Sequence, residues 1–380
     1  MKRSRCFFIF LLLIFAVIAS SAHDLFCHKP DFLPSDKKAT KETIKLYQHL
    51  FSLAEKGFMF GHQDDLAYGV GWKYKKGRSD IKDVTGDYPA VYGWELGGLE
   101  LDQLVNLDSV PFNKMQQFIK ESYEKGGVIT ISWHLHNPLT GKTAWDPSAG
   151  TVASVLPGGT KHELFKSWLD KVAVFMKGLK GKHGEFIPVI FRPFHELNGN
   201  WFWWGGNHCT ADEFKKMWMF TVNYLQNEKM IHHLLYAYNT DRFASRDEYL
   251  EKYPGNEWVD IIGVDIYQKK ASNEKFKEEL DQMLTMLTAI AIEKNKLPAL
   301  TEFGGNLSTI NWWTDVFLKG MGNHKISYVL GWRNAGLKAN DEFEFYVPYK
   351  GQMTSKNFIE FYQSEKTFFL KDISNKKFYQ

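Results

Sequence analysis

The chain has 380 residues, of which 24% are charged and 44% hydrophobic, so it is long enough for one large domain or two ordinary ones and lacks the composition of a disordered chain. Its 47 basic and 44 acidic residues leave a net charge of +3, which argues against a nucleic-acid-binding surface. Aromatic residues make up 16% of the sequence, and this excess indicates stacking sites beyond an ordinary core.

Residues 1–22 have the pattern of a secretory signal peptide. A basic start is followed by an apolar stretch over 7–18 and by small residues that lead to His23. The apolar stretch is too short for a membrane span, so we expect no stable membrane insertion. The pattern predicts export to the periplasm or the cell exterior, with cleavage near His23 and a single domain over 23–380.

The mature chain then keeps two cysteines, Cys27 and Cys209. They could form a disulfide in an oxidising compartment, but their separation in sequence leaves that pairing open. The sequence contains no cysteine pattern for zinc.

From residue 40 onward, helical patterns alternate with short apolar or β-branched segments. Helices are predicted over 40–56, 112–125, 162–179, 211–227, 273–294 and 311–319, with a capping box at Thr210 and Glu213 and with Gly126 and Gly320 as helix ends. Strands are predicted over 58–60, 90–94, 128–133, 188–191, 234–238, 261–264, 299–301 and 328–331. Eight such units predict a single α/β domain, a (β/α)8 TIM barrel, rather than an open doubly wound sheet, which would carry a glycine-rich phosphate turn.

In such a barrel the active site lies at the carboxyl ends of the strands. Polar or aromatic residues follow every predicted strand: Gly61 to Asp64, Trp94 and Glu95, His134 to Asn137, His195 and Glu196, Asn239, Asp265 to Tyr267, Glu302, and Trp332 to Asn334. We therefore expect these groups to share one rim.

The stretch 187–206 reads IPVIFRPFHELNGNWFWWGG, in which an apolar run delivers Arg192, His195 and Glu196 into a cluster of three tryptophans and a phenylalanine. We interpret it as a strand, a site and a platform for sugar rings. A carboxyl beside apolar rings is hard to ionise, so Glu196 should stay protonated. The alternative is that these aromatic residues belong to the core and Glu196 is a surface carboxylate.

A second carboxyl comes from Glu302, in ALTEFGG, which ends the seventh predicted strand while Glu196 ends the fourth. Glycoside hydrolysis with retention needs two carboxyl groups about 5 to 5.5 Å apart. Glu196, beside apolar indoles, is expected to be the protonated acid/base, and Glu302 the ionised nucleophile. Arg192 and the Tyr267 hydroxyl are the expected donors to the Glu302 carboxylate. A helix cap or a barrel salt bridge is the alternative role for Glu302.

Other polar residues near the strand ends carry weaker signals. His134 and His136 share one strand face and could ligate a metal, but no carboxylate follows at a useful spacing, so we expect hydrogen bonding and no metal. Glu95 and Asp102 could reach the distal end of the sugar or belong to a solvated rim. His62, Gln63 and Asp64 could form a structural network or an outer subsite.

At this point the chain resembles the β-mannanases of glycoside hydrolase family 26, within the clan of retaining barrel glycosidases. The resemblance covers most of 58–335. It rests on five motifs: ISWHLHNP at 131–138, FRPFHELNGNWFWWG at 191–205, GVDIY at 263–267, TEFG at 301–304 and GWRNA at 331–335.

The resemblance implies Glu196 as acid/base and Glu302 as nucleophile, positioned by His195 and Tyr267. It implies that Trp201 floors the site. Mannose on the non-reducing side would meet His134, Trp332 and Arg333, with Trp145 as a further aromatic contact. The full set expected at the substrate is His134, Trp145, Arg192, His195, Trp201, Tyr267, Trp332 and Arg333.

We therefore predict a catalytic barrel over 23–380, a monomer that cleaves mannan, glucomannan or galactomannan as a retaining endo-acting β-1,4-mannanase without cofactor or metal. One alternative keeps the fold and mechanism on β-1,3-xylan or mixed-linkage β-glucan, and another is exo-type release of mannobiose. A non-enzyme alternative is a glycan-binding barrel that has kept the aromatic platform.

Overall fold

The computed structural model describes residues 32–338, 341–374 and 378–379. The chain divides into two units, residues 1–33 and residues 34–380, and the second unit holds the fold described below. The predicted signal peptide and Cys27 lie outside the described residues, so export and the Cys27 to Cys209 pairing stay predictions.

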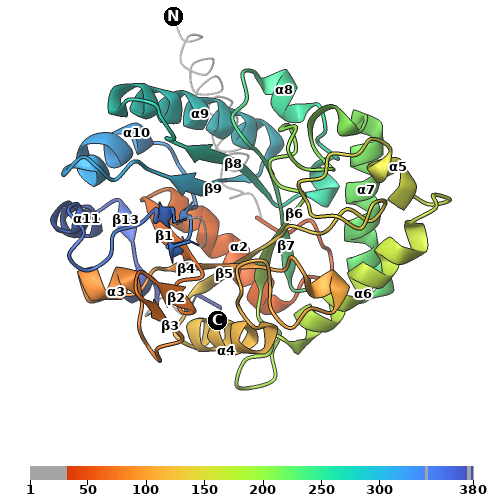
Figure 1. The fold of residues 1–380 in the computed structure, drawn as a ribbon, viewed down its shortest axis with the longest axis horizontal. Helices are drawn as coiled ribbons and strands as arrows, with labels where there is room; N and C mark the ends of the chain where they lie inside the picture. The colour runs from red at the N-terminus through yellow and green to blue at the C-terminus, as the bar shows by residue number, and fades with distance from the viewer. Residues whose placement is uncertain (1–31, 339–340, 375–377, 380) are drawn as a thin grey trace, which may run out of the picture. The chain divides into compact units, whose positions relative to one another are not determined.

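Eight parallel strands form a closed barrel with helices around it (Figure 1). In barrel order they are β1 (Phe58–Gln63), β4 (Val91–Glu95), β5 (Val128–Trp133), β6 (Val189–Pro193), β7 (Leu234–Thr240), β8 (Ile261–Tyr267), β9 (Leu297–Gly304) and β10 (Tyr328–Gly331). Pairing of β1 with β10, which sets Met59 opposite Tyr328, closes the ring. The eight predicted strands and the (β/α)8 TIM barrel are confirmed.

The helices of the described chain are α2 (Lys41–Ala54), α3 (Asp80–Thr85), α4 (Phe112–Glu124), α5 (Thr151–Val155), α6 (His162–Gly178), α7 (Ala211–Asn223), α8 (Arg246–Leu250), α9 (Asn273–Lys294), α10 (Lys319–Met321), α11 (Ser355–Tyr362) and α12 (Leu370–Ser374). Five short helical turns are η1 (Leu99–Leu101), η2 (Gly206–His208), η3 (Tyr224–Glu228), η4 (Asn256–Trp258) and η5 (Trp312–Leu318). Minor strands are β2 (Tyr68–Gly69), β3 (Trp72–Lys73), β11 (Gly336–Leu337), β12 (Phe343–Glu344) and β13 (Thr367–Phe368).

Local sequence explains where the helices begin and end. The predicted capping box is present at the start of α7. The Thr210 side chain accepts from the Glu213 backbone N–H, and the Glu213 side chain accepts from the Thr210 backbone N–H. Gly126, with φ of 92°, follows α4 as predicted. The prediction for Gly320 is wrong, because Gly320 lies inside α10 and the helix ends at Gly322, with φ of 52°.

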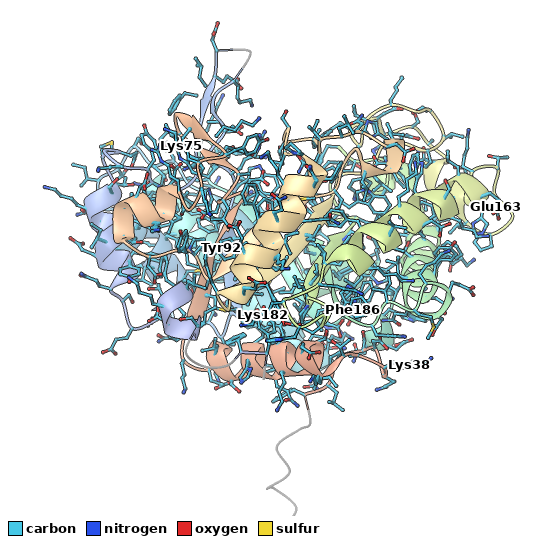
Figure 2. The ribbon with its side chains drawn as sticks, turned by 90° about the horizontal axis from the view of Figure 1, so that it is seen from below. Lys38, Lys75, Tyr92, Glu163, Lys182 and Phe186 are labelled. Atoms are coloured by element: carbon cyan, nitrogen blue, oxygen red, sulfur yellow. The ribbon has the colours of Figure 1, made fainter. Side chains whose placement is uncertain are left out.

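The barrel strands are buried along nearly their whole length, since helices cover the outside and side chains fill the inside. Their continuous apolar runs follow from burial on both faces. At the amino-terminal ends of the strands α2 lies across the barrel, where the Tyr47 hydroxyl donates to the Asp260 carbonyl at 3.0 Å. Figure 2 shows α2 below the barrel and Lys75, on the loop after β3, at the opposite end. That opposite end carries the candidate site.

Within the described part of the chain, no helix combines the length and the apolar character that a bilayer crossing requires.

Candidate active site

Two glutamates face each other at the carboxyl ends of the strands. Glu302 belongs to β9. Glu196 follows β6, and its own backbone φ is 49°. One carboxyl oxygen from each of Glu196, Asp265 and Glu302 lies within 4.8 Å of the others. The fold therefore brings together two acids that are far apart in the sequence.

Glu302 is held by the two donors expected from the sequence. An Arg192 Nη2 hydrogen bond reaches its Oε1, and the Tyr267 hydroxyl donates to its Oε2 at 2.9 Å. Arg192 is 1% exposed and also donates to Asp265 Oδ2 at 3.1 Å and to Asn239 Oδ1 at 3.3 Å. These contacts hold Glu302 in one orientation in a buried setting, which suits an ionised carboxylate.

The three clustered carboxyls offer oxygen atoms at a spacing that a metal ion could use. The Arg192 guanidinium already donates to two of them, Asp265 and Glu302, and supplies the positive charge that a metal would bring. Burial opposes this charge, yet Glu302 and Asp265 raise the pKa of Arg192 above its ordinary range. The chemistry of this cluster is thus that of an arginine-bridged acid network.

Glu196 has the opposite character. Burial, followed by the neighbouring Glu302 and Asp241 carboxyls, raises the pKa of Glu196 to about 8. The Trp201 indole N–H donates to Glu196 Oε2 at 2.7 Å and partly offsets that shift. Glu196 therefore keeps its proton at neutral pH, in agreement with the prediction that this carboxyl is hard to ionise.

The aromatic cluster after β6 is divided between site and core. Trp201 is 36% exposed, whereas Trp203 and Trp204 are fully buried and Phe202 almost so. The indole N–H groups of the two buried tryptophans donate to the backbone carbonyls of Leu135 and His195. The interpretation of the whole cluster as a sugar platform is therefore wrong for these three residues, since their rings fill the space behind the site.

A second exposed indole packs against His134. Trp145 is 46% exposed and stacks on the His134 ring, with centroids 5.2 Å apart and planes at 15°. The Trp332 ring lies 6.4 Å from His134. Trp145 and Trp332 are thus partly exposed rings beside His134, and Trp201 is a partly exposed ring beside Glu196.

His134 is fixed by a carboxylate that was not expected to reach it. Glu95, at the end of β4, accepts from the His134 backbone N–H at 2.7 Å and binds its Nδ1 at 2.8 Å. Burial raises the pKa of Glu95, but His134 outweighs burial and lowers it to about 2. Conversely, burial lowers the pKa of His134 and Glu95 more than reverses this, leaving it raised.

His195 contacts His134 rather than either catalytic candidate. The two Nε2 atoms are 3.0 Å apart, and burial, followed by His134 and Arg192, depresses the pKa of His195. A protonated His134 can donate to a neutral His195 in this arrangement. Among the described residues, the His195 ring bonds to His134 and to neither Glu196 nor Glu302, so the positioning role implied for His195 acts only through its neighbours.

Glu95 lies in neither of the two places expected for it, the outer part of the sugar or a solvated rim. Its carboxyl is fully buried against His134 and Ser132, so it does not reach the distal part of a sugar. A similar pair joins His136 Nδ1 to Glu100 Oε1 at 2.7 Å. The carboxylate partners of both histidines therefore come from the preceding strand unit, a relation that no local spacing in the sequence shows.

Arg333 lies at the rim in a network of charges. Its Nη1 is 3.1 Å from Asp108 Oδ1, and its Nη2 is 3.5 Å from Glu344 Oε1. Asp64 accepts from the Tyr68 hydroxyl at 2.7 Å in the same region, and burial raises its pKa well above the ordinary range. His62 and Gln63 are also buried, while Asp102 is exposed and paired with Lys171.

Asp265 and Asn239 belong to this site, although the sequence indicated no individual role for either. Asn239 Nδ2 and Thr301 Oγ1 donate to the Asp265 carboxyl at 2.8 Å and 2.7 Å. Burial and the nearby Glu302 raise the pKa of Asp265. Their positions at the ends of β7 and β8 were the available signal, but the bridge through Arg192 requires the closed barrel.

A parallel eight-stranded barrel that sets two glutamates and exposed indoles on its carboxyl rim has the architecture of a glycoside hydrolase. The chain belongs to glycosyl hydrolase family 26, whose model matches residues 35–323. The resemblance seen in the sequence is thereby confirmed.

Known relatives agree with this membership. A mannan endo-1,4-β-mannosidase of Bifidobacterium adolescentis is 32% identical over 358 residues, which cover 87% of this chain and 35% of that protein. A GH26 β-mannanase structure from Bacteroides ovatus is 41% identical with a TM-score of 0.85, covering 90% of this chain and 98% of the other. The catalytic domain of a Bacillus sp. GH26 endo-β-1,4-mannanase is 33% identical with a TM-score of 0.83, covering 92% and 96%.

Proposed function

We propose that this chain is a retaining, endo-acting β-1,4-mannanase that hydrolyses mannan, glucomannan or galactomannan by double displacement. The observation that carries the proposal is the spacing of Glu196 and Glu302, whose closest oxygens lie within 4.8 Å. An inverting enzyme needs room for a water molecule between carboxyls about 6.5 to 9.5 Å apart. The names of the relatives support the substrate and the internal mode of cleavage.

In the first step the Glu302 carboxylate attacks the anomeric carbon and forms a glycosyl ester. The bond from that carbon to the glycosidic oxygen breaks, and Glu196 gives its proton to the leaving oxygen. The raised pKa of Glu196, about 8, keeps this proton available at neutral pH. Arg192 and Tyr267 hold Glu302 so that one orientation of its carboxylate is presented to the sugar.

In the second step Glu196, now ionised, takes a proton from water. The resulting hydroxide attacks the anomeric carbon from the face that the leaving group left, and the ester bond to Glu302 breaks. Both catalytic groups return to their starting states. Two inversions at one carbon give a product of the same anomeric configuration as the substrate.

The rings around the glutamates fit a sugar substrate. Pyranose rings have apolar C–H faces that stack on indoles, and Trp145 and Trp201 present such faces to solvent. His134 and Trp332 lie near each other on the rim that carries the glutamates, Arg333 follows Trp332, and these three residues would bind mannose toward the non-reducing end. We propose these roles from the family resemblance together with this placement.

The nucleophile assignment is tested with Glu302→Ala. We expect the release of reducing ends from linear mannan to fall by about 10³-fold or more, because the covalent route is lost. The matched control is Glu293→Ala on α9, which removes an exposed ion pair with Arg246 of α8 and should keep wild-type turnover. A Glu302→Ala protein that is folded and retains wild-type turnover on mannan would refute the mechanism.

Substrate and cleavage mode are tested together with purified polysaccharides. The panel includes the two alternative substrates, mixed-linkage β-glucan and β-1,3-xylan. We expect activity on mannan, glucomannan and galactomannan and a broad range of early product lengths. Mannobiose as the sole early product would indicate exo-type release, and binding without new reducing ends would indicate a glycan-binding protein.

We also propose that the enzyme is exported and acts as a monomer in the periplasm or outside the cell. The basic, apolar and small-residue segments of residues 1–22 support export. Amino-terminal sequencing of the protein from the producing cell should begin at His23, and a mature protein that still begins at Met1 would contradict the proposal.

A further inference from the structure

The loop over 197–206 leaves the barrel directly after Glu196 and carries Trp201. Its two ends meet in a neck, where the Gly206 backbone N–H donates to the Leu197 carbonyl at 2.9 Å. From the body of the loop, the Trp201 indole donates to Glu196 at 2.7 Å. The geometry of the neck therefore determines where Trp201 stands against the proposed acid.

A lysine from a different part of the chain lies against this neck. Lys252 follows α8 on the connection to β8 and is 4% exposed. Its Nζ is 2.6 Å from the Gly206 carbonyl oxygen, 3.4 Å from the Leu197 carbonyl oxygen and 3.7 Å from Cys209 Sγ. One ammonium group thus binds both ends of the loop.

The nature of these partners is unusual for a buried lysine. An ammonium taken out of water is costly unless charge or hydrogen bonds compensate it, and a carboxylate is the common partner. Among the described residues, the hydrogen-bond partners of Lys252 are two carbonyls and a thiol. Two carbonyl oxygens that converge on one point repel each other, so the ammonium between them adds to the Gly206 to Leu197 backbone hydrogen bond in holding the neck together.

The same connection holds the loop at a second point. Asn198 Nδ2 donates to the Arg242 carbonyl at 2.7 Å, and the Asp241 backbone N–H donates to Asn198 Oδ1 at 2.8 Å. Residues 241–252 therefore act as the support of the 197–206 loop. Lys252 is the member of this support that contacts both ends of the loop.

We propose that Lys252 is a positioning residue for catalysis: it keeps the 197–206 neck closed so that Trp201 retains its hydrogen bond to Glu196. The inference rests on the proposed acid/base role of Glu196. Lys252 touches neither Glu196 nor the exposed indole face, so it acts through the loop. Its side chain belongs to the β7 to β8 connection, outside the motifs from which the family resemblance was drawn.

The test is Lys252→Met, which keeps most of the apolar stem and removes the donors. For linear manno-oligosaccharides, whose leaving group needs a proton, we expect kcat/KM to fall by about tenfold or more, because misplaced catalytic groups lose that much. For 2,4-dinitrophenyl β-mannobioside, whose phenolate leaves without a proton, kcat/KM should stay within about twofold. A lysine that merely stabilises the fold would lower both values alike.

Two further variants serve as controls. Lys296→Met removes a half-buried lysine that donates to the Asn256 carbonyl at 2.7 Å, before β9 at the other end of the barrel, and should leave both substrates unaffected. Trp201→Phe removes the indole donor itself and also alters the ring that faces the sugar, so it should lower kcat/KM for both substrates, with the larger loss for the manno-oligosaccharides. The double variant Lys252→Met/Trp201→Phe should lose little more kcat/KM on manno-oligosaccharides than Trp201→Phe alone, since both changes disrupt the same hydrogen bond from Trp201 to Glu196.

A measurement without substrate separates this inference from the proposed function. Amide hydrogen exchange over 197–206 should become faster in Lys252→Met and stay at the wild-type rate in Lys296→Met. If wild-type protein cleaves no glycan, the proposed function fails while the exchange result still tests the neck. Unchanged exchange over 197–206, or equal losses on both substrates, would overturn the positioning role of Lys252.

Discussion

At the scale of single residues, the two glutamates differ in what surrounds them. Glu302 has two donors, Arg192 and Tyr267, that favour its charged form. Glu196 has one donor, Trp201. It is otherwise buried, with the Glu302 and Asp241 carboxyls nearby. Two neighbouring carboxylates repel each other, so at this spacing an ionised Glu302 favours the protonated form of Glu196.

This environment predicts the alkaline limb of the pH profile. The acid works only while Glu196 is protonated, so kcat/KM on manno-oligosaccharides should fall as the pH rises through about 8. With 2,4-dinitrophenyl β-mannobioside the limb should be weak or absent, since that leaving group needs no proton. A limb of the same position and depth for both substrates would contradict the assignment of Glu196 as acid.

The same shift predicts how Glu196 affects stability. A carboxyl whose pKa is raised in the folded state favours folding at low pH, and this contribution is lost as the pH rises from about 4.5 to about 8. Glu196→Gln has no charge to bury. Its Tm should therefore exceed that of the wild type by more at pH 8 than at pH 5, as measured by calorimetry, while its activity on mannan falls about 10²- to 10⁴-fold. An equal Tm difference at both pH values would contradict the shift.

At the scale of elements, the 197–206 loop joins core and site in one short segment. Phe202, Trp203 and Trp204 anchor it in the core, and Trp201 alone among its aromatic residues faces the glutamates. Gly206 closes the loop with φ of 46°, and a Cβ there would stand 1.9 Å from Asn200 Oδ1. The loop therefore needs glycine both for its backbone and for its space.

A glycine substitution tests this reading of the loop. Gly206→Ala and Gly184→Ala each place a side chain at positive φ, which costs about 1 to 2 kcal/mol. Gly184, with φ of 84°, has open space around it, so its variant should lose stability alone. Gly206→Ala should also lose most of its activity on mannan, because Asn200 must move and the neck with it. Wild-type kcat/KM in a folded Gly206→Ala protein would show that the loop geometry has no role in catalysis.

How far the sequence predicted these elements depends on the range of the interactions. Strands and long helices follow from local periodicity, and the polar strand ends correctly marked the rim that holds Glu196 and Glu302. Partners from other units were not predictable: Glu95 reaches His134 only because β4 and β5 pair side by side. The division between exposed Trp201 and buried Trp203 likewise depends on the direction of each side chain, which composition does not show.

At the scale of the whole molecule, the barrel separates stability from chemistry. The amino-terminal ends of the strands are covered by α2, and the carboxyl ends carry the glutamates and indoles. This division is typical of barrel enzymes. Damage at the covered end should therefore lower stability and leave the chemistry intact.

Leu50→Ala tests the separation. Leu50 is fully buried in α2, so its truncation should cost about 2 to 5 kcal/mol in the free energy of unfolding. Below its lowered Tm the variant should keep wild-type kcat on mannan, while Lys45→Ala on the exposed face of α2 should change stability by no more than about 0.5 kcal/mol. A large loss of kcat in folded Leu50→Ala would show that the two ends of the barrel are coupled.

The central claim is that a buried acid and an ionised nucleophile, close enough for direct attack, cleave a β-mannosidic bond. The most direct measurement is proton NMR of the new reducing end formed from linear mannopentaose, recorded before mutarotation scrambles the anomers. The account predicts that the β-anomer of mannose is formed first. The α-anomer as the first product would show single displacement by water and would contradict the account.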